Sequence, residues 1–151
     1  MEKHDSPETI AWQGDIDGHL VLIDQTRLPV EMTYVECRDV ETVWEAIKML
    51  RVRGAPAIGI AAAYGVCIGL QPAVKSSAND FSAKIAEVTD YLATSRPTAV
   101  NLDYAVERVL KAIKNIDKPN QKTSIALQTA HDITEESVTH CRQIGEYGLS
   151  L

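Results

Sequence analysis

The chain has 151 residues, of which 45% are hydrophobic and 24% are charged, so it is long enough to form one domain around its own core. Its formal net charge is -6 and it contains no Lys- or Arg-rich tract, which excludes nucleic acid as an expected partner.

Residues 1–38 are predicted to form a β-rich subregion. Strand-forming runs occur at Ile10–Trp12, Leu20–Ile23 and Thr33–Val35. Asp17-Gly18 lies between the first two runs and favours a hairpin turn, because glycine tolerates the positive φ of tight turns. We therefore expect a small antiparallel sheet at the start of the chain.

Residues 39–151 are predicted to form a bundle of about five helices that ends in a long helix, which makes the fold class α+β. The first helix follows Asp39, a capping residue. Its apolar residues recur every three or four positions and so lie on one face. The second begins at Ala55-Pro56, where proline suits a first helical turn. Its sequence is apolar on nearly every face, so we expect it to be the central helix.

Three more helices are predicted after a loop at residues 72–79. Asp80 is expected to cap the third, and Pro97-Thr98 to begin the fourth. The fifth runs from about Thr123, and its apolar stripe is expected to include Leu127, Ala130, Thr134, Val138, Cys141 and Gly148. Because this stripe still continues at Leu151 without a capping residue, we expect the chain to be part of a longer protein.

Cysteine usage and the amino terminus favour a cytoplasmic protein. Cys37, Cys67 and Cys141 are odd in number and widely spaced, which fits reduced thiols rather than a disulfide framework or a metal site. The polar start at residues 1–7 lacks the apolar segment of a secretory signal. The tract Ala55–Leu70 is shorter than the ~20 residues of a membrane-spanning helix, so we expect a buried helix and no membrane partner.

A phosphate-binding site is predicted where the second and fourth helices begin. Arg53 and the small residues Gly54 and Ala55 precede a helix whose first amides and dipole favour an anion. Arg96 stands in the same position before Pro97, and a guanidinium is a forked donor suited to phosphate. On spacing alone, a simpler interpretation stays open, in which Gly54 and Pro56 shape a turn and the arginines are solvated or ion-paired.

Other reactive residues are not expected to form a site. His131 and Glu135 have helical i,i+4 spacing but no third metal ligand, so we expect a solvated face. His140 and Cys141 are adjacent and point in different directions on a helix. His4 and His19 are expected at the surface, and Arg51 as an exposed cation near a helix C-terminus. The sequence therefore predicts no catalytic residue and no metal ligand in this chain.

Three segments in the same order resemble the methylthioribose-1-phosphate isomerases, in the superfamily of the regulatory subunits of translation initiation factor 2B. They are LVLIDQTRLP at residues 20–29, MLRVRGAPAIGIAAAYG at residues 49–65 and SRPTAVNL at residues 95–102. The resemblance covers nearly the whole chain from Ile10 onward. The pair RGAPAIG and RPTAVNL is specific to this family.

The resemblance implies an isomerase of methionine salvage that converts 5-methylthioribose 1-phosphate to 5-methylthioribulose 1-phosphate without a metal or nucleotide cofactor. It assigns substrate contacts to Arg53, Gly54, Ala55 and Arg96. The catalytic Cys and Asp of the family belong to a Rossmann-like carboxyl-terminal domain. The resemblance implies that this domain is absent from residues 1–151. Residues 1–151 would then be the amino-terminal domain, inactive alone, of a protein that is a homodimer at full length.

Two other functions stay open on this resemblance. One is ribose-1,5-bisphosphate isomerase, a related enzyme with a different substrate. The other is a non-enzymatic protein like the regulatory subunits, in which the domain serves protein interaction. The intact RGAPAIG segment argues against the second, because an interaction module does not need an exposed helix start behind an arginine.

Overall fold

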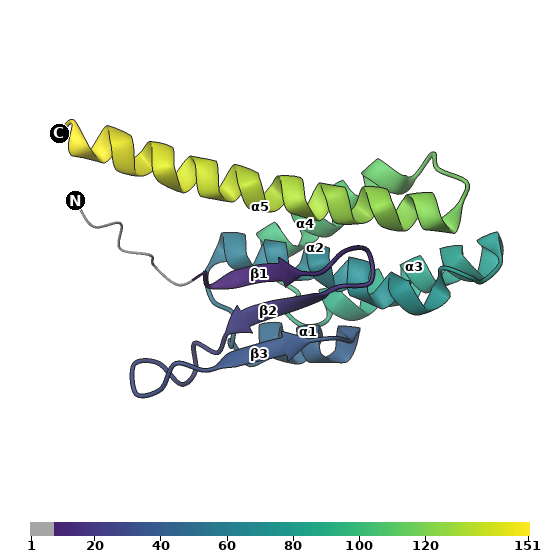
Figure 1. Cartoon of the computed structure of the whole chain (residues 1–151), viewed down its shortest axis with the longest axis horizontal. Coiled ribbons are helices and arrows are strands. Elements are labelled where there is room, and N and C mark those ends of the chain that lie inside the picture. Colours follow the sequence, from purple (N-terminus) through teal and green to yellow (C-terminus); the bar gives the residue numbers. More distant parts are fainter. Residues whose placement is uncertain (1–7) are drawn as a thin grey trace.

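The computed structural model describes residues 8–151, and over this range the fold is α+β, as predicted (Figure 1). The expectations for His4 and the polar start at residues 1–7 lie outside the described residues. The antiparallel sheet has the order β1-β2-β3. Its strands and the helices that follow are β1 (Ile10–Gln13), β2 (His19–Ile23), β3 (Tyr34–Cys37), α1 (Val40–Lys48), α2 (Ala55–Leu70), the short 3-10 helix η1 (Gln71–Ala73), α3 (Ala78–Ala93), α4 (Val100–Ile113) and α5 (Pro119–Leu149).

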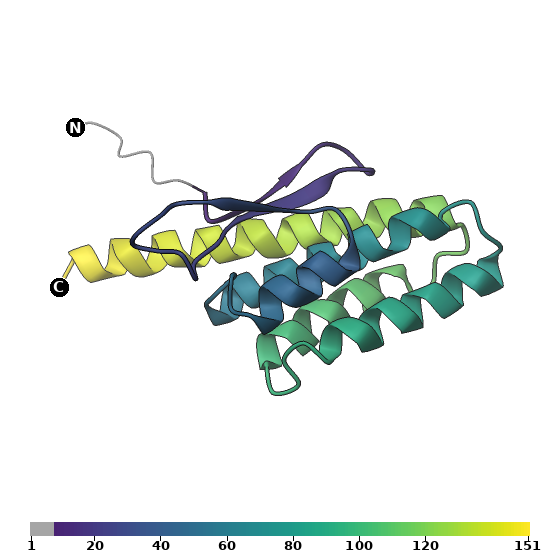
Figure 2. The same cartoon turned by 90° about the horizontal axis from the view of Figure 1, so that it is seen from below.

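Helix α2 is the centre of the fold, as its uniform apolarity predicts. Every residue from Ile58 to Leu70 is buried. The sheet lies across α1 and α2, and α3, α4 and α5 surround the rest of α2 (Figure 2). The stretch Ala55–Ala73 has 19 residues because η1 extends the helix, so length alone does not separate it from a membrane span. Instead, 72% of its most apolar window is buried inside the fold, as expected for a core helix.

The β1–β2 hairpin differs in detail from the prediction. The residue with positive φ is Gly14, at 92°, rather than Gly18. Gly18 is required for another reason, because a Cβ there would lie 2.2 Å from the carbonyl oxygen of Gln13. His19, expected at the surface, is half-buried, and its Nε2 is buried without a hydrogen-bond partner in residues 8–151.

Two predicted helix starts are displaced. Asp39 caps α1 as expected and accepts a hydrogen bond from the Thr42 amide. However, Ser77 rather than Asp80 caps α3, and the Asp80 amide donates to its hydroxyl at 3.1 Å. Helix α4 begins at Val100, so the turn that contains Pro97 lies before the helix and not in its first turn. At α3, two neighbouring residues could both cap the helix and Ser77 does so, whereas no side chain caps the start of α4 among residues 8–151.

Helix α5 begins four residues before the predicted start and is only half packed. Leu127 and Ala130 are buried against the bundle, but the predicted stripe does not continue inward, because Val138 is 64% exposed and Cys141 is exposed. All residues from His140 to Leu151 are exposed. Figure 1 shows this half of the helix extending past the other helices. Nothing in residues 8–151 covers it.

Gly59 allows α2 to approach α4, and we expect Gly59→Ala to lower the free energy of unfolding by about 1–3 kcal/mol. The added Cβ would lie 2.9 Å from the backbone carbonyl oxygen of Asn101, so one helix must move. Gly145 is the matched control, since a Cβ there meets no atom within 4 Å. Gly145→Ala should raise the free energy of unfolding by about 0.5–1 kcal/mol. Urea unfolding checks both, and equal effects would contradict the close contact.

Candidate functional site

A pocket of about 290 Å³ lies between the start of α2 and the segment that leads into α4. Its lining residues are Ala55, Ile58, Arg96, Thr98, Ala99, Val100 and Asn101. Two of the four predicted site residues, Ala55 and Arg96, therefore line one pocket although 41 positions separate them in the chain. The fold brings the two predicted segments together.

The start of α2 is open to the pocket. Gly54 is the residue before the helix, with φ 95° and ψ 135°, a conformation that favours glycine. Within residues 8–151, no side chain caps this helix, and its first turn contains no acidic residue. Pro56 has no amide hydrogen, so this turn offers one donor fewer than an ordinary helix start. The outward amides and the helix dipole make this end attractive to an anion.

The segment around Arg96 is fixed from both sides. The hydroxyl of Thr94 accepts a hydrogen bond from Trp44 Nε1 at 2.8 Å, which ties the end of α3 to α1. The buried hydroxyl of Ser95 donates to the Leu92 carbonyl at 2.6 Å. The Ala99 amide then donates to the Arg96 carbonyl at 3.0 Å and closes the turn. Arg96 thus projects from a backbone that is held in place on the pocket wall.

Arg53 and Gly54 are exposed beside this pocket and do not line it. The simpler interpretation of the sequence is therefore right that Gly54 shapes a turn. Of its two options for the arginines, ion pairing is not seen, because neither Arg53 nor Arg96 forms a salt bridge with any residue in the range 8–151, and the exposed position of Arg53 fits the solvated option. Both guanidinium groups are available to an external anion.

A second group of charges was missed by sequence reasoning. Arg51, expected to be exposed, has a side chain that is 29% exposed and pairs with the buried Asp24 and with Glu45. Burial alone would raise the pKa of Asp24, but hydrogen bonds from Thr26 and Arg51 outweigh it and lower that pKa. Hydrogen bonds to Glu45 raise the pKa of Arg51. One feature of the sequence could have indicated this group: the carboxylate of Asp24 comes directly after the apolar strand at Leu20–Ile23.

The remaining candidates form no reactive cluster. His131 is half-buried rather than solvated, and its Nδ1 is 2.8 Å from the hydroxyl of Tyr64. No group of three metal-ligating side chains exists among residues 8–151. All three cysteines are free, as expected. Burial raises the pKa of Cys37 and of Cys67 to about 12, so both stay protonated thiols.

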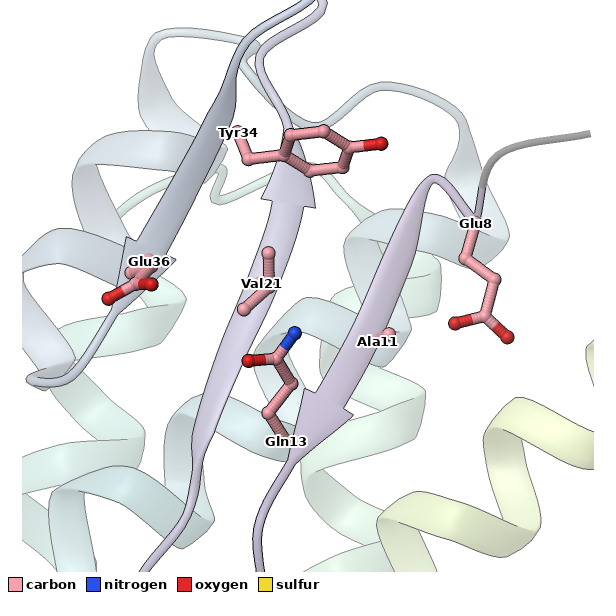
Figure 3. Close-up of a pocket in the computed structure, with 6 residues that line it drawn as sticks. All are labelled: Glu8, Ala11, Gln13, Val21, Tyr34 and Glu36. Atoms are coloured by element: carbon pink, nitrogen blue, oxygen red, sulfur yellow. The ribbon is translucent and has the colours of Figure 1, made fainter.

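A larger hollow, of about 690 Å³, lies on the outer face of the sheet and is not suited to a phosphate. Figure 3 shows Glu8 and Glu36 on opposite sides of this face, with Val21 on the strand between them. The lining contains two carboxylates and no cation. An anion would be repelled there, so the pocket at Ala55 and Arg96 is the better site.

Residues 51–151 match the family described as Initiation factor 2 subunit family. The chain belongs to this family. The match includes Arg53, Gly54, Ala55 and Arg96. It confirms the superfamily that the motifs RGAPAIG and RPTAVNL indicate.

Relatives within the initiation factor 2 subunit family include curated isomerases. The chain is 45% identical to a 5-deoxyribose 1-phosphate isomerase of Bacillus cereus over 144 residues, 94% of the chain and 41% of that protein. It is 44% identical to a methylthioribose-1-phosphate isomerase of Acaryochloris marina, over 94% of the chain and 39% of that protein. The chain thus spans about two fifths of the length of these relatives.

Two solved structures of the family share the fold. The 5-methylthioribose 1-phosphate isomerase from Pyrococcus horikoshii OT3 superposes with a TM-score of 0.81 at 31% identity, over 87% of this chain and 37% of that one. The delta subunit of translation initiation factor eIF-2B from A. fulgidus superposes with a TM-score of 0.80 at 38% identity, over 88% and 38%. The fold alone therefore does not separate an isomerase from an initiation-factor subunit.

Proposed function

We propose that residues 1–151 are the amino-terminal domain of an aldose–ketose isomerase that acts on a 5-substituted ribose 1-phosphate. The observation that carries this proposal is the pocket in which Arg96 faces the uncapped start of α2 at Ala55. Relatives named as isomerases of two such sugar phosphates, at 44% and 45% identity, support it. The domain supplies binding, and the rest of the whole protein supplies the chemistry.

The phosphate binds at the start of α2 in this proposal. Arg96 donates two parallel hydrogen bonds to phosphate oxygens from the pocket wall. Gly54 and Ala55 carry little side chain, so the phosphate approaches the first free amides of the helix closely. Arg53, exposed at the entrance, reaches the same phosphate with its long side chain. These groups recognise a dianion and leave the sugar to the remainder of the protein.

The preferred substrate is 5-methylthioribose 1-phosphate, and the product is 5-methylthioribulose 1-phosphate, as a step of methionine salvage. The phosphate on C1 blocks simple ring opening, so the enzyme assists opening and then moves a hydrogen between C1 and C2. The reaction is redox-neutral and needs no metal or nucleotide cofactor. The groups that move the hydrogen lie outside these 151 residues, and no residue here is assigned as catalytic. The whole protein is a cytoplasmic homodimer in this proposal.

A non-enzymatic role is the second candidate, because the delta subunit from A. fulgidus has the same fold at 38% identity. Such a subunit would use this domain for protein contacts. The open helix start beside Ala55 argues against that role, since its outward amides are suited to a small anion. Activity decides between the two.

The full-length protein is expected to convert 5-methylthioribose 1-phosphate to its ketose, followed by NMR of the product. The 151-residue chain alone should show no turnover. Two other compounds, 5-deoxyribose 1-phosphate and ribose 1,5-bisphosphate, are assayed in parallel. The three values of kcat/KM then rank the substrates. If only ribose 1,5-bisphosphate is converted, it is the substrate in place of 5-methylthioribose 1-phosphate. If none of the three sugar phosphates is converted, the non-enzymatic role is favoured.

A further inference from the structure

We infer that Asp24, Glu45 and Arg51 are positioning residues that hold the Arg53–Gly54 segment in place for phosphate binding. This inference rests on the proposed function and names residues that do not themselves touch the substrate. The three side chains, called the Asp24 network below, join the end of β2, helix α1 and the segment before α2.

Asp24 is the buried member of the network. Its side chain is only 4% exposed, and each carboxylate oxygen has partners. Oδ1 accepts hydrogen bonds from the amide and the hydroxyl of Thr26, and Oδ2 accepts from Arg51 Nη1 at 2.7 Å. The Asp24 amide donates to the Thr33 carbonyl at 2.8 Å. Oδ2 also faces Arg27 Nε at 3.9 Å, and the two hydrogen bonds from Thr26 fix the orientation of the carboxylate toward Arg51.

The guanidinium, the backbone amide and the backbone carbonyl of Arg51 all form hydrogen bonds. Its Nε and Nη2 donate to the Glu45 carboxylate at 2.8 Å each, while Nη1 faces Asp24. Its backbone carbonyl accepts from the Gln25 amide at 2.9 Å, and its amide donates to the Ala46 carbonyl at 2.9 Å. The side chain and both backbone groups of one residue therefore fix the chain two positions before Arg53.

The segment after Arg51 has few other restraints. Val52 is buried, and Arg53, Gly54, Ala55 and Pro56 are then exposed before α2 enters the core. Gly54 lacks a side chain, so it adds no packing to restrict the backbone. The place and direction of Arg53 thus depend on Arg51 and Val52 on one side and on α2 on the other.

A network of charged side chains fixes the direction of a backbone segment, which apolar packing does less well. A buried carboxylate is costly unless it is paired, and such pairs are weak evidence of stability. Their hydrogen bonds are directional, however, and a fixed direction is what a binding loop needs. The location of this network next to the candidate site is therefore better explained by positioning than by stability alone.

Asp24→Asn in the full-length protein tests the inference, because the amide keeps the shape and removes the charge that faces Arg51. We expect the KM for 5-methylthioribose 1-phosphate, and the dissociation constant of inorganic phosphate measured by calorimetry, to rise about tenfold. The kcat should be retained, since only binding is affected. In the background of Arg53→Ala, Asp24→Asn should add little, because the two changes act on the same contact.

Two control variants separate positioning from stability. Glu136→Gln breaks the bidentate pair with Arg108 between α4 and α5, and Ile113→Val removes a buried methylene at the end of α4 far from the pocket. Both should lower Tm and leave phosphate binding unchanged. If Arg53→Ala weakens binding but Asp24→Asn does not, or if the controls weaken binding equally, the inference is overturned while the proposed function stands. If Arg53→Ala itself has no effect, the assigned role of Arg53 fails and the positioning role fails with it.

Discussion

Arg96→Ala in the full-length protein is expected to lower kcat/KM for 5-methylthioribose 1-phosphate by about 10- to 150-fold. Arg96 lines the pocket and forms no salt bridge in residues 8–151, so its charge is free for the phosphate. A hydrogen bond to a charged group contributes about 1.5–3 kcal/mol, which corresponds to that range. Steady-state kinetics of the purified variant measures the change.

Arg53→Ala should weaken binding as well, but less, because Arg53 is exposed and does not line the pocket. Arg38 is the control, since it is an exposed arginine on the sheet side that pairs with Glu36. Arg38→Ala should leave the kinetics unchanged. Unchanged kinetics in both Arg53→Ala and Arg96→Ala would remove the proposed site.

Ala55→Glu is expected to change activity and stability in opposite directions. The new carboxylate occupies the first position of α2, where it interacts favourably with the helix dipole and should stabilise the fold by about 0.3–1 kcal/mol. The same charge lies in the pocket that is to receive the phosphate. Because like charges in contact cost several kcal/mol, we expect kcat/KM to fall by at least about 100-fold.

Thermal unfolding and kinetics of the same Ala55→Glu sample separate the two effects. Ala55→Gln is the matched control, because it adds the same volume without the charge. A fall caused by the charge will be much larger for Glu than for Gln. Equal losses in the two variants would mean that bulk alone blocks the pocket, and retained activity in Ala55→Glu would place the phosphate elsewhere.

The helices of this fold are predictable because their apolar spacing matches their burial. Leu102, Val106, Val109 and Ile113 recur every three or four positions and all face the core of the structure. The boundaries are less predictable, because Ser77 and Asp80 both suit a helix start and only local geometry selects Ser77. The C-terminal half of α5 keeps an apolar stripe that nothing in residues 8–151 covers, so periodicity alone overstates its burial.

The candidate site was predictable in part for a similar reason. The features of a phosphate-binding helix start are local, so Arg53, Gly54 and Ala55 stand out from spacing. The same local pattern predicts Arg96, which lines the pocket, although its proline precedes the helix and does not begin it. The Asp24–Arg51 pair was missed because its members are 27 positions apart, and only the fold joins a strand end to the segment before α2.

A crystal structure of the full-length protein with bound 5-methylthioribose 1-phosphate is the most direct test of the proposed binding site. We predict that the phosphate lies at the start of α2, within hydrogen-bond distance of the Ala55 amide and of the guanidinium groups of Arg53 and Arg96. A phosphate bound away from this helix start, with both arginines in solvent, would contradict the proposal.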